Sequence, residues 1–149
     1  MQGKNWIRIA LCGWVVGVVY FLLCTLSIPF LVQDFVALVE EGGPHTPWGG
    51  GVSFGIDLMM GIWTMWLYSA IAPRYGAGAK TAAIAGVAWW AMKSLQSAKW
   101  AGLGFLPLTV GPVLVPLAIT VIYMVVASEI GAWLYERVEM PAAKRLPES

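Results

Sequence analysis

The chain has 149 residues, of which 59% are hydrophobic and 11% charged, and its net charge is +1. Soluble domains are typically about 45–50% apolar, so this composition excludes an ordinary soluble domain and makes the lipid bilayer the expected surroundings. A net charge so close to zero provides no long-range field for nucleic acid, which we do not expect as a partner.

Cysteine and histidine content limits the chemistry that the chain can support. Cys12 and Cys24 fall on one predicted helix, about 18 Å apart along its axis, which is too far for a disulfide. His45 is the single histidine, so a structural zinc site and a bis-histidine haem lack ligands. The sequence contains no GxSxG, HExxH, GxGxxG or Walker motif. We therefore predict no catalytic residue, no metal and no cofactor.

Four apolar segments predict four membrane-spanning helices, at residues 6–32, 52–72, 81–98 and 112–134. A helix needs about 20 apolar residues to cross the hydrocarbon. Pro29 is expected to kink or end the first helix near Ser27, and Pro73 to close the second. Residues 33–41 and 99–111 are predicted to be interfacial segments, and residues 135–149 a short charged tail. The predicted fold is a single all-α domain, a transmembrane four-helix bundle.

The loop between the second and third predicted helices carries residues suited to a tight turn at a membrane boundary: Pro73, Arg74, Gly76, Gly78 and Lys80. Cytoplasmic loops carry an excess of lysine and arginine. If both termini are cytoplasmic, the far side holds only Lys99 outside the spans, and the cytoplasmic side holds Lys4, Arg8, Arg74, Lys80, Arg137, Lys144 and Arg145. The count predicts that both termini are cytoplasmic.

Two charges interrupt the second and third predicted helices at similar depth. Asp57 and Lys93 each lie roughly 8 to 9 Å inside the outer end of their helices. A hairpin makes these helices neighbours, so an ion pair is available that would offset the cost of each charge in hydrocarbon. Two interpretations stay open: a fixed pair that sets the register of two helices, which we favour, or a group that takes part in transport.

Asp57 also belongs to a polar stripe of the second helix. At 100° per residue, the stripe contains Ser53, Asp57, Gly61, Thr64 and Tyr68, and it should point inward. Lys93 similarly shares a face with Ala82, Gly86 and Trp89 on the third helix.

Glu129 is the remaining charge inside a predicted span, toward the opposite end from Asp57. Its nearest candidate cation is Arg8, at the start of the first helix. With apolar neighbours it is a candidate protonatable group, but a boundary residue hydrogen-bonded to serine or tryptophan is the simpler interpretation.

Pairs of small residues recur on three predicted helices: Gly13 with Gly17, Ala82 with Gly86, and Ala127 with Gly131. Two small residues one helical turn apart, which we call a small-residue step, allow another helix to approach closely. We expect partner molecules to cover these steps, in a homo-oligomer or with other membrane proteins. The leading hypothesis is a non-enzymatic interaction or scaffold subunit. The alternative is a small-solute or proton-coupled transporter that uses Asp57, Lys93 and Glu129.

Two stretches carry a family resemblance: WLYSAIAPRYGAGAKTAAIAG at 66–86 and ASEIGAWLYE at 127–136. They resemble small bacterial integral membrane proteins that have no known activity. The resemblance implies a four-helix topology in the bacterial inner membrane and places the hairpin loop in the family's signature. Ala77 and Ala79 stand where the family has proline at one position or both, which implies a looser turn.

Overall fold

The computed structural model describes residues 6–31, 49–102 and 110–143. These residues form four α-helices: α1 Trp6–Leu31, α3 Gly49–Tyr75, α4 Ala79–Gly102 and α5 Val110–Ala143. The all-α prediction is confirmed for this part of the chain. The glycines and prolines of residues 42–51, which include His45, predict an exposed loop on the far side of the membrane; residues 49–51 belong to α3 instead. The rest of this loop and most of the expected interfacial segments lie outside the described residues.

Three of the helices are long and apolar enough to cross a membrane, through the segments Trp6–Ser27, Gly50–Tyr75 and Leu117–Arg137. Each exceeds the roughly 20 residues that the hydrocarbon requires. The remaining helix, α4, has 24 residues and is less apolar, because it contains Lys80, Lys93 and Lys99. Three candidate spans support the prediction of a membrane protein.

The turn between α3 and α4 is shorter than expected, because Pro73 does not close the helix. α3 continues through Pro73 to Tyr75, since a proline in the last turn removes one hydrogen bond without displacing the residues after it. Gly76 then takes a φ of 85°, and its N–H donates to the Ala72 carbonyl at 2.9 Å. A glycine in the left-handed conformation is a common C-terminal cap of a helix. Gly78, with a φ of 135°, completes the turn before α4.

α1 ends at Leu31, within one residue of the predicted end at 32. Pro29 does not end it near Ser27, because a backbone inside lipid must keep its remaining polar groups bonded internally. One other helix end differs from expectation. α5 continues through residues expected to form the charged tail and ends at Ala143. Tyr135 and Glu136 in this extension contact Tyr68, and these contacts stabilise the extra turns.

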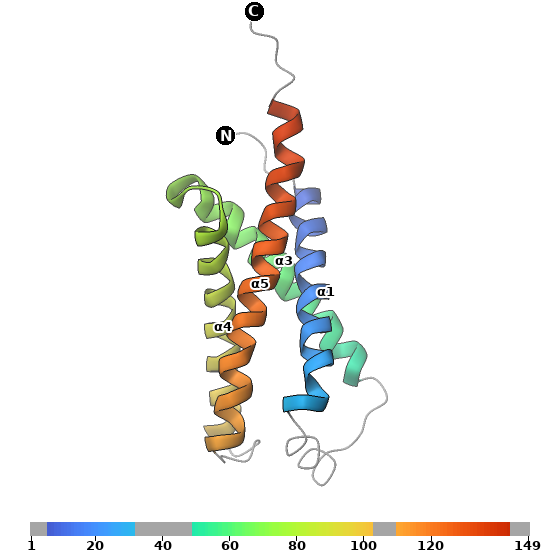
Figure 1. Ribbon diagram of the computed structural model, residues 1–149, viewed down its shortest axis with the longest axis vertical. Helices are drawn as coiled ribbons and strands as arrows, with labels where there is room; N and C mark the ends of the chain where they lie inside the picture. Colours follow the sequence, from blue (N-terminus) through green and yellow to red (C-terminus); the bar gives the residue numbers. More distant parts are fainter. Residues whose placement is uncertain (1–5, 32–48, 103–109, 144–149) are drawn as a thin grey trace, which may run out of the picture.

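In a simple hairpin α3 and α4 would pack chiefly against each other, but both pack more extensively against other helices. α3 packs chiefly against α1, which it crosses at an angle, and α5 packs against both α4 and α1 (Figure 1). The contact between α3 and α4 is smaller. The beginning of α1, the turn between α3 and α4 and the end of α5 all lie toward one end of the molecule (Figure 1).

The small-residue steps are covered within the chain, which corrects the expectation that partners cover them. A Cβ built on Gly13 would lie 2.3 Å from Cα of Ile62, and one on Gly17 would lie 2.7 Å from the carbonyl oxygen of Asp57. Gly86 similarly faces the backbone of Met124. Since their own neighbouring helices fill these positions, the steps give no reason to expect self-association.

Candidate functional site

The polar stripe of α3 faces the interior, as its spacing predicts. Asp57, Gly61, Thr64 and Tyr68 are buried, whereas Ser53, close to the start of the helix, is exposed. The Thr64 hydroxyl donates to the Met60 carbonyl at 2.8 Å within the same helix. Thr64 is therefore satisfied locally, and Asp57 and Tyr68 are the stripe residues that bond to other helices.

Asp57 and Lys93 lie together in the half of the molecule away from the α3–α4 turn. Lys93 Nζ is 3.4 Å from Asp57 Oδ1, and the side chains are 12% exposed for Asp57 and 45% for Lys93. The aspartate is thus mostly enclosed, while the lysine reaches it from a half-open position. A carboxylate in such surroundings requires a cation or hydrogen-bond donors, and Lys93 supplies both.

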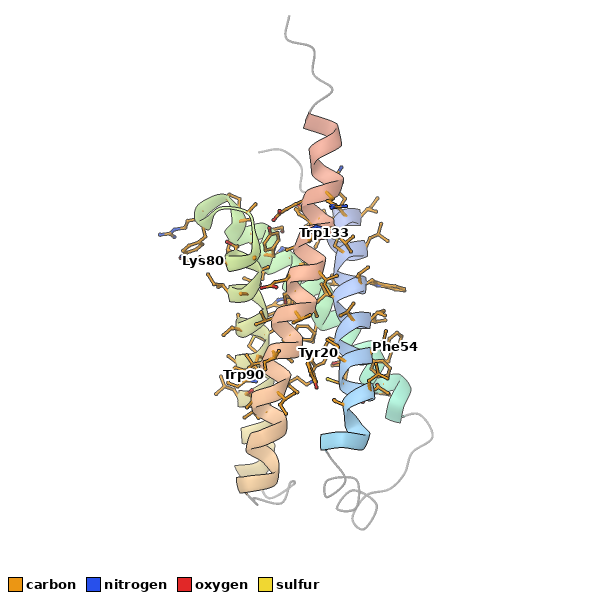
Figure 2. The ribbon with its side chains drawn as sticks, in the orientation of Figure 1. Tyr20, Phe54, Lys80, Trp90 and Trp133 are labelled. Atoms are coloured by element: carbon orange, nitrogen blue, oxygen red, sulfur yellow. The ribbon has the colours of Figure 1, made fainter. Side chains whose placement is uncertain are left out.

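Tyr20 adds a third helix to this pair. Lys93 Nζ donates a hydrogen bond of 2.8 Å to the Tyr20 hydroxyl, which is shorter than its contact with Asp57. Tyr20 points inward from α1 (Figure 2) and is 1% exposed. We call Tyr20, Asp57 and Lys93 the charge cluster; it joins α1, α3 and α4.

Trp89 packs beside the charge cluster and fixes the position of Tyr20. The two ring centroids are 4.8 Å apart, with an interplanar angle of 53°, a tilted arrangement that aromatic pairs favour. Trp89 is fully buried. Its Nε1 has no hydrogen-bond partner among the described residues. Trp89 therefore contributes packing to this site, one turn before Lys93 on the same helix.

A second polar group lies at the α3–α4 turn. The Tyr68 hydroxyl donates to Glu136 Oε1 on α5 and accepts a 3.1 Å hydrogen bond from the Gly78 N–H in the turn. The ring of Tyr68 also packs edge-on against Tyr135, with centroids 6.1 Å apart. One buried tyrosine thereby holds the hairpin turn against the extension of α5. The other predicted loop residues, Pro73, Arg74, Gly76 and Lys80, are exposed.

Glu129 is not brought together with Arg8. Because α5 turns Ala127, Ser128 and Gly131 toward its neighbours, Glu129 lies on the opposite, exposed face. Within the described residues it makes no ion pair or hydrogen bond. Arg8 is half-buried at the start of α1.

Sequence reasoning placed Asp57 and Lys93 at one depth but missed Tyr20 and Glu136. Tyr20 is the tyrosine of a helix without charges from Ile9 onward, and its hydroxyl, which needs a partner in hydrocarbon, was the available signal. Glu136 was assigned to the tail. Finding either contact requires knowing which non-consecutive helices are neighbours.

The described residues contain no group of three or more histidine, cysteine, aspartate or glutamate side chains that could hold a metal ion. The arrangement instead suits fixed electrostatic pairing between helices. No protein-family model matches this chain, and neither a curated protein nor a solved structure matches it. The class that the structure defines is a helical protein with three candidate membrane spans.

Proposed function

We propose that this chain is a non-enzymatic integral membrane protein that serves as an interaction or scaffold subunit of a membrane assembly. The observation that carries the proposal is the charge cluster, in which Lys93 binds Asp57 and Tyr20 at once. The charges of Asp57 and Lys93 are neutralised by each other, and the bonds connect three helices, so the cluster is suited to holding the fold in one arrangement.

In this proposal α4 is the fourth span of a four-helix bundle. Its 24 residues are long enough to cross the hydrocarbon, and it lies alongside α5, one of the candidate spans (Figure 1). Its central lysine is compensated by Asp57, which lowers the cost of placing it in lipid.

We also propose that both termini are cytoplasmic, in a bacterial plasma membrane. Four cations near helix ends lie toward one end of the molecule, at the start of α1, at the α3–α4 turn and near the end of α5: Arg8, Arg74, Lys80 and Arg137. Lys99, near the end of α4, is the exception at the other end. The positive-inside rule assigns such an end to the cytoplasm. The bacterial membrane is proposed from the expected resemblance of residues 66–86 alone.

A transporter would need ionisable groups that line a path and exchange their partners. Breaking the contacts of Lys93 would remove the polar bonds that join α4 to both α1 and α3. Glu129 lies on the outer surface of α5 rather than between helices. The two carboxylates therefore do not form the consecutive sites that proton relays use.

One observation favours the alternative, a small-solute or proton-coupled transporter. The Lys93 side chain is 45% exposed, so the charge cluster is accessible from one side. A solute or proton could reach the pair there.

Flux through liposomes tests the proposal against this alternative. Purified protein is reconstituted with a pH-sensitive dye inside the vesicles, and proton flux down an imposed gradient is compared for the native chain, Asp57→Asn and Glu129→Gln. A scaffold subunit gives the flux of empty vesicles in all three cases. Flux through the native chain that either substitution abolishes would refute the scaffold function.

A further inference from the structure

Three exposed cations lie at the end of the molecule that carries the α3–α4 turn, which we call the turn end. Arg74 and Lys80 flank the turn, and Arg137 lies on α5. Figure 2 labels Lys80 at the turn and Trp133 on α5, both toward this end of the molecule. The turn end therefore presents positive charge both from the α3–α4 hairpin and from α5.

Positive charge exceeds negative charge in the segments attached to the turn end, whichever pairs form among them. The segments that precede Ile9, form the turn or follow Leu134 contain seven lysine and arginine residues and three glutamates: Lys4, Arg8, Arg74, Lys80, Arg137, Lys144 and Arg145, with Glu136, Glu139 and Glu148. At least four of these cations therefore have no carboxylate in the same segments to neutralise them. Glu136 is also half-buried and accepts a hydrogen bond from the Tyr68 hydroxyl, so it is directed into the fold.

Two of the exposed cations are arginines that lie over exposed aromatic rings. Arg137 Cζ is 3.9 Å from the centroid of the Trp133 ring, and Arg74 Cζ is 5.9 Å from that of Tyr75. Trp133 is 51% exposed and Tyr75 is 62% exposed, and such rings favour the headgroup level of a bilayer. Stacking uses the face of a guanidinium and leaves the N–H groups in its plane able to donate. Both arginines are thus positioned to bind oxygen atoms at headgroup level.

Charge complementarity selects a lipid with a net negative charge as the partner. Phosphatidylcholine carries a cation that compensates its phosphate, whereas anionic lipids attract basic residues close to the membrane surface. A guanidinium also matches a phosphate through two parallel N–H···O bonds. In the proposed membrane arrangement, the acidic residues of segment 32–48 belong to the far side of the membrane and do not compete for these cations.

We propose that the turn end binds anionic phospholipid of the cytoplasmic leaflet, with Arg74 and Arg137 as the residues that bind phosphate and Lys80 as a further source of positive charge. This inference rests on the membrane arrangement in the proposed function and adds a lipid headgroup as a partner. The guanidinium N–H groups donate to the phosphate oxygens, while the aromatic rings keep the two arginines at the membrane surface.

Lipid retention by the full-length protein tests the inference. The protein in a non-ionic detergent is titrated, in separate samples, with phosphatidylglycerol and with phosphatidylcholine of the same acyl chains. Native mass spectrometry then counts the lipid molecules that each protein retains. We expect the native chain to retain about fivefold more phosphatidylglycerol than phosphatidylcholine at equal lipid concentration. Arg74→Gln combined with Arg137→Gln should bring this retention ratio close to one.

Two further comparisons separate binding at these arginines from general attraction between charges. Lys99→Gln is the matched control for Arg137→Gln, because each removes one cation near a helix end; Lys99→Gln should keep the retention ratio and Arg137→Gln should lower it. Arg74→Lys combined with Arg137→Lys keeps the charge but not the planar donor group, and should retain only part of the preference. Equal losses in Lys99→Gln and Arg137→Gln, or full preference in the double lysine variant, would each overturn the inference.

These outcomes are separable from those of the proposed function. Equal retention of the two lipids by the native chain, together with absence of proton flux, refutes lipid binding and leaves the scaffold function standing; the occupant of the turn end is then an acidic segment of another protein. Proton flux that Asp57→Asn abolishes refutes the scaffold function, whatever the retention ratio.

Discussion

Gly61 of α3 meets Gly13 of α1 at backbone distance: a Cβ built on Gly61 would lie 2.3 Å from the Gly13 carbonyl oxygen. The same close approach sets the backbone of Asp57 against Gly17, one turn further along α1 and one turn earlier along α3. Tyr20 follows Gly17 on α1 by three residues and so lies on the same face. The glycines of α1 and α3 therefore position two of the three residues of the charge cluster.

Gly61→Ala should destabilise the protein by about 2 to 3 kcal/mol, because the added methyl group meets backbone atoms that can move only if the helices separate. Gly55→Ala on the same helix is the matched control, since nothing lies within 4 Å of its Cβ position. It should leave stability unchanged or raise it by up to about 1 kcal/mol through helix propensity. Thermal unfolding in detergent, followed by circular dichroism, measures both. Equal stability of the two variants would contradict the close packing of α1 and α3.

Tyr68→Phe should loosen the α3–α4 turn, since it removes the hydroxyl that bonds both Glu136 and the Gly78 N–H. We expect a loss of about 1 to 2 kcal/mol and faster amide hydrogen exchange at Gly78. Tyr75→Phe is the control, because Tyr75 is exposed at the end of α3. Unchanged exchange at Gly78 in Tyr68→Phe would show that the hydroxyl does not hold the turn.

The proposed orientation predicts where a thiol at the turn can be labelled. In a background of Cys12→Ala and Cys24→Ala, Ala77→Cys should react with a membrane-impermeant maleimide only after the cells are permeabilised. His45→Cys, in the loop predicted on the far side, should react in intact cells. The reverse pattern would place the termini outside the cell.

The sequence was sufficient for the helical class and for the shared level of Asp57 and Lys93 on their helices, because both follow from local composition and from the rise per residue. It could not identify which helices are neighbours. Asp57 and Lys93 could be matched in depth across a turn, but Tyr20 joins them from a helix that is not adjacent in sequence.

The small-residue steps were predicted to pack, but against the wrong molecule, since Gly13 and Gly17 lie against α3 of the same chain. The end of the second predicted helix was placed at 72, too early, because α3 continues through Pro73 to Tyr75. Glu129 is exposed on α5. Which side of α5 it occupies, and hence its separation from Arg8, depends on tertiary packing, which the sequence does not reveal.

Asp57 and Lys93 stabilise the fold as a coupled pair, and a double-mutant cycle measures that coupling. Asp57→Asn and Lys93→Met are each expected to cost about 1 to 2 kcal/mol, less than for a fully buried pair because the lysine is half-exposed. Unfolding of the detergent-solubilised single and double variants gives the coupling free energy. We predict that the double variant recovers about 1 kcal/mol or more of the summed losses. Simple addition of the two losses would contradict the account.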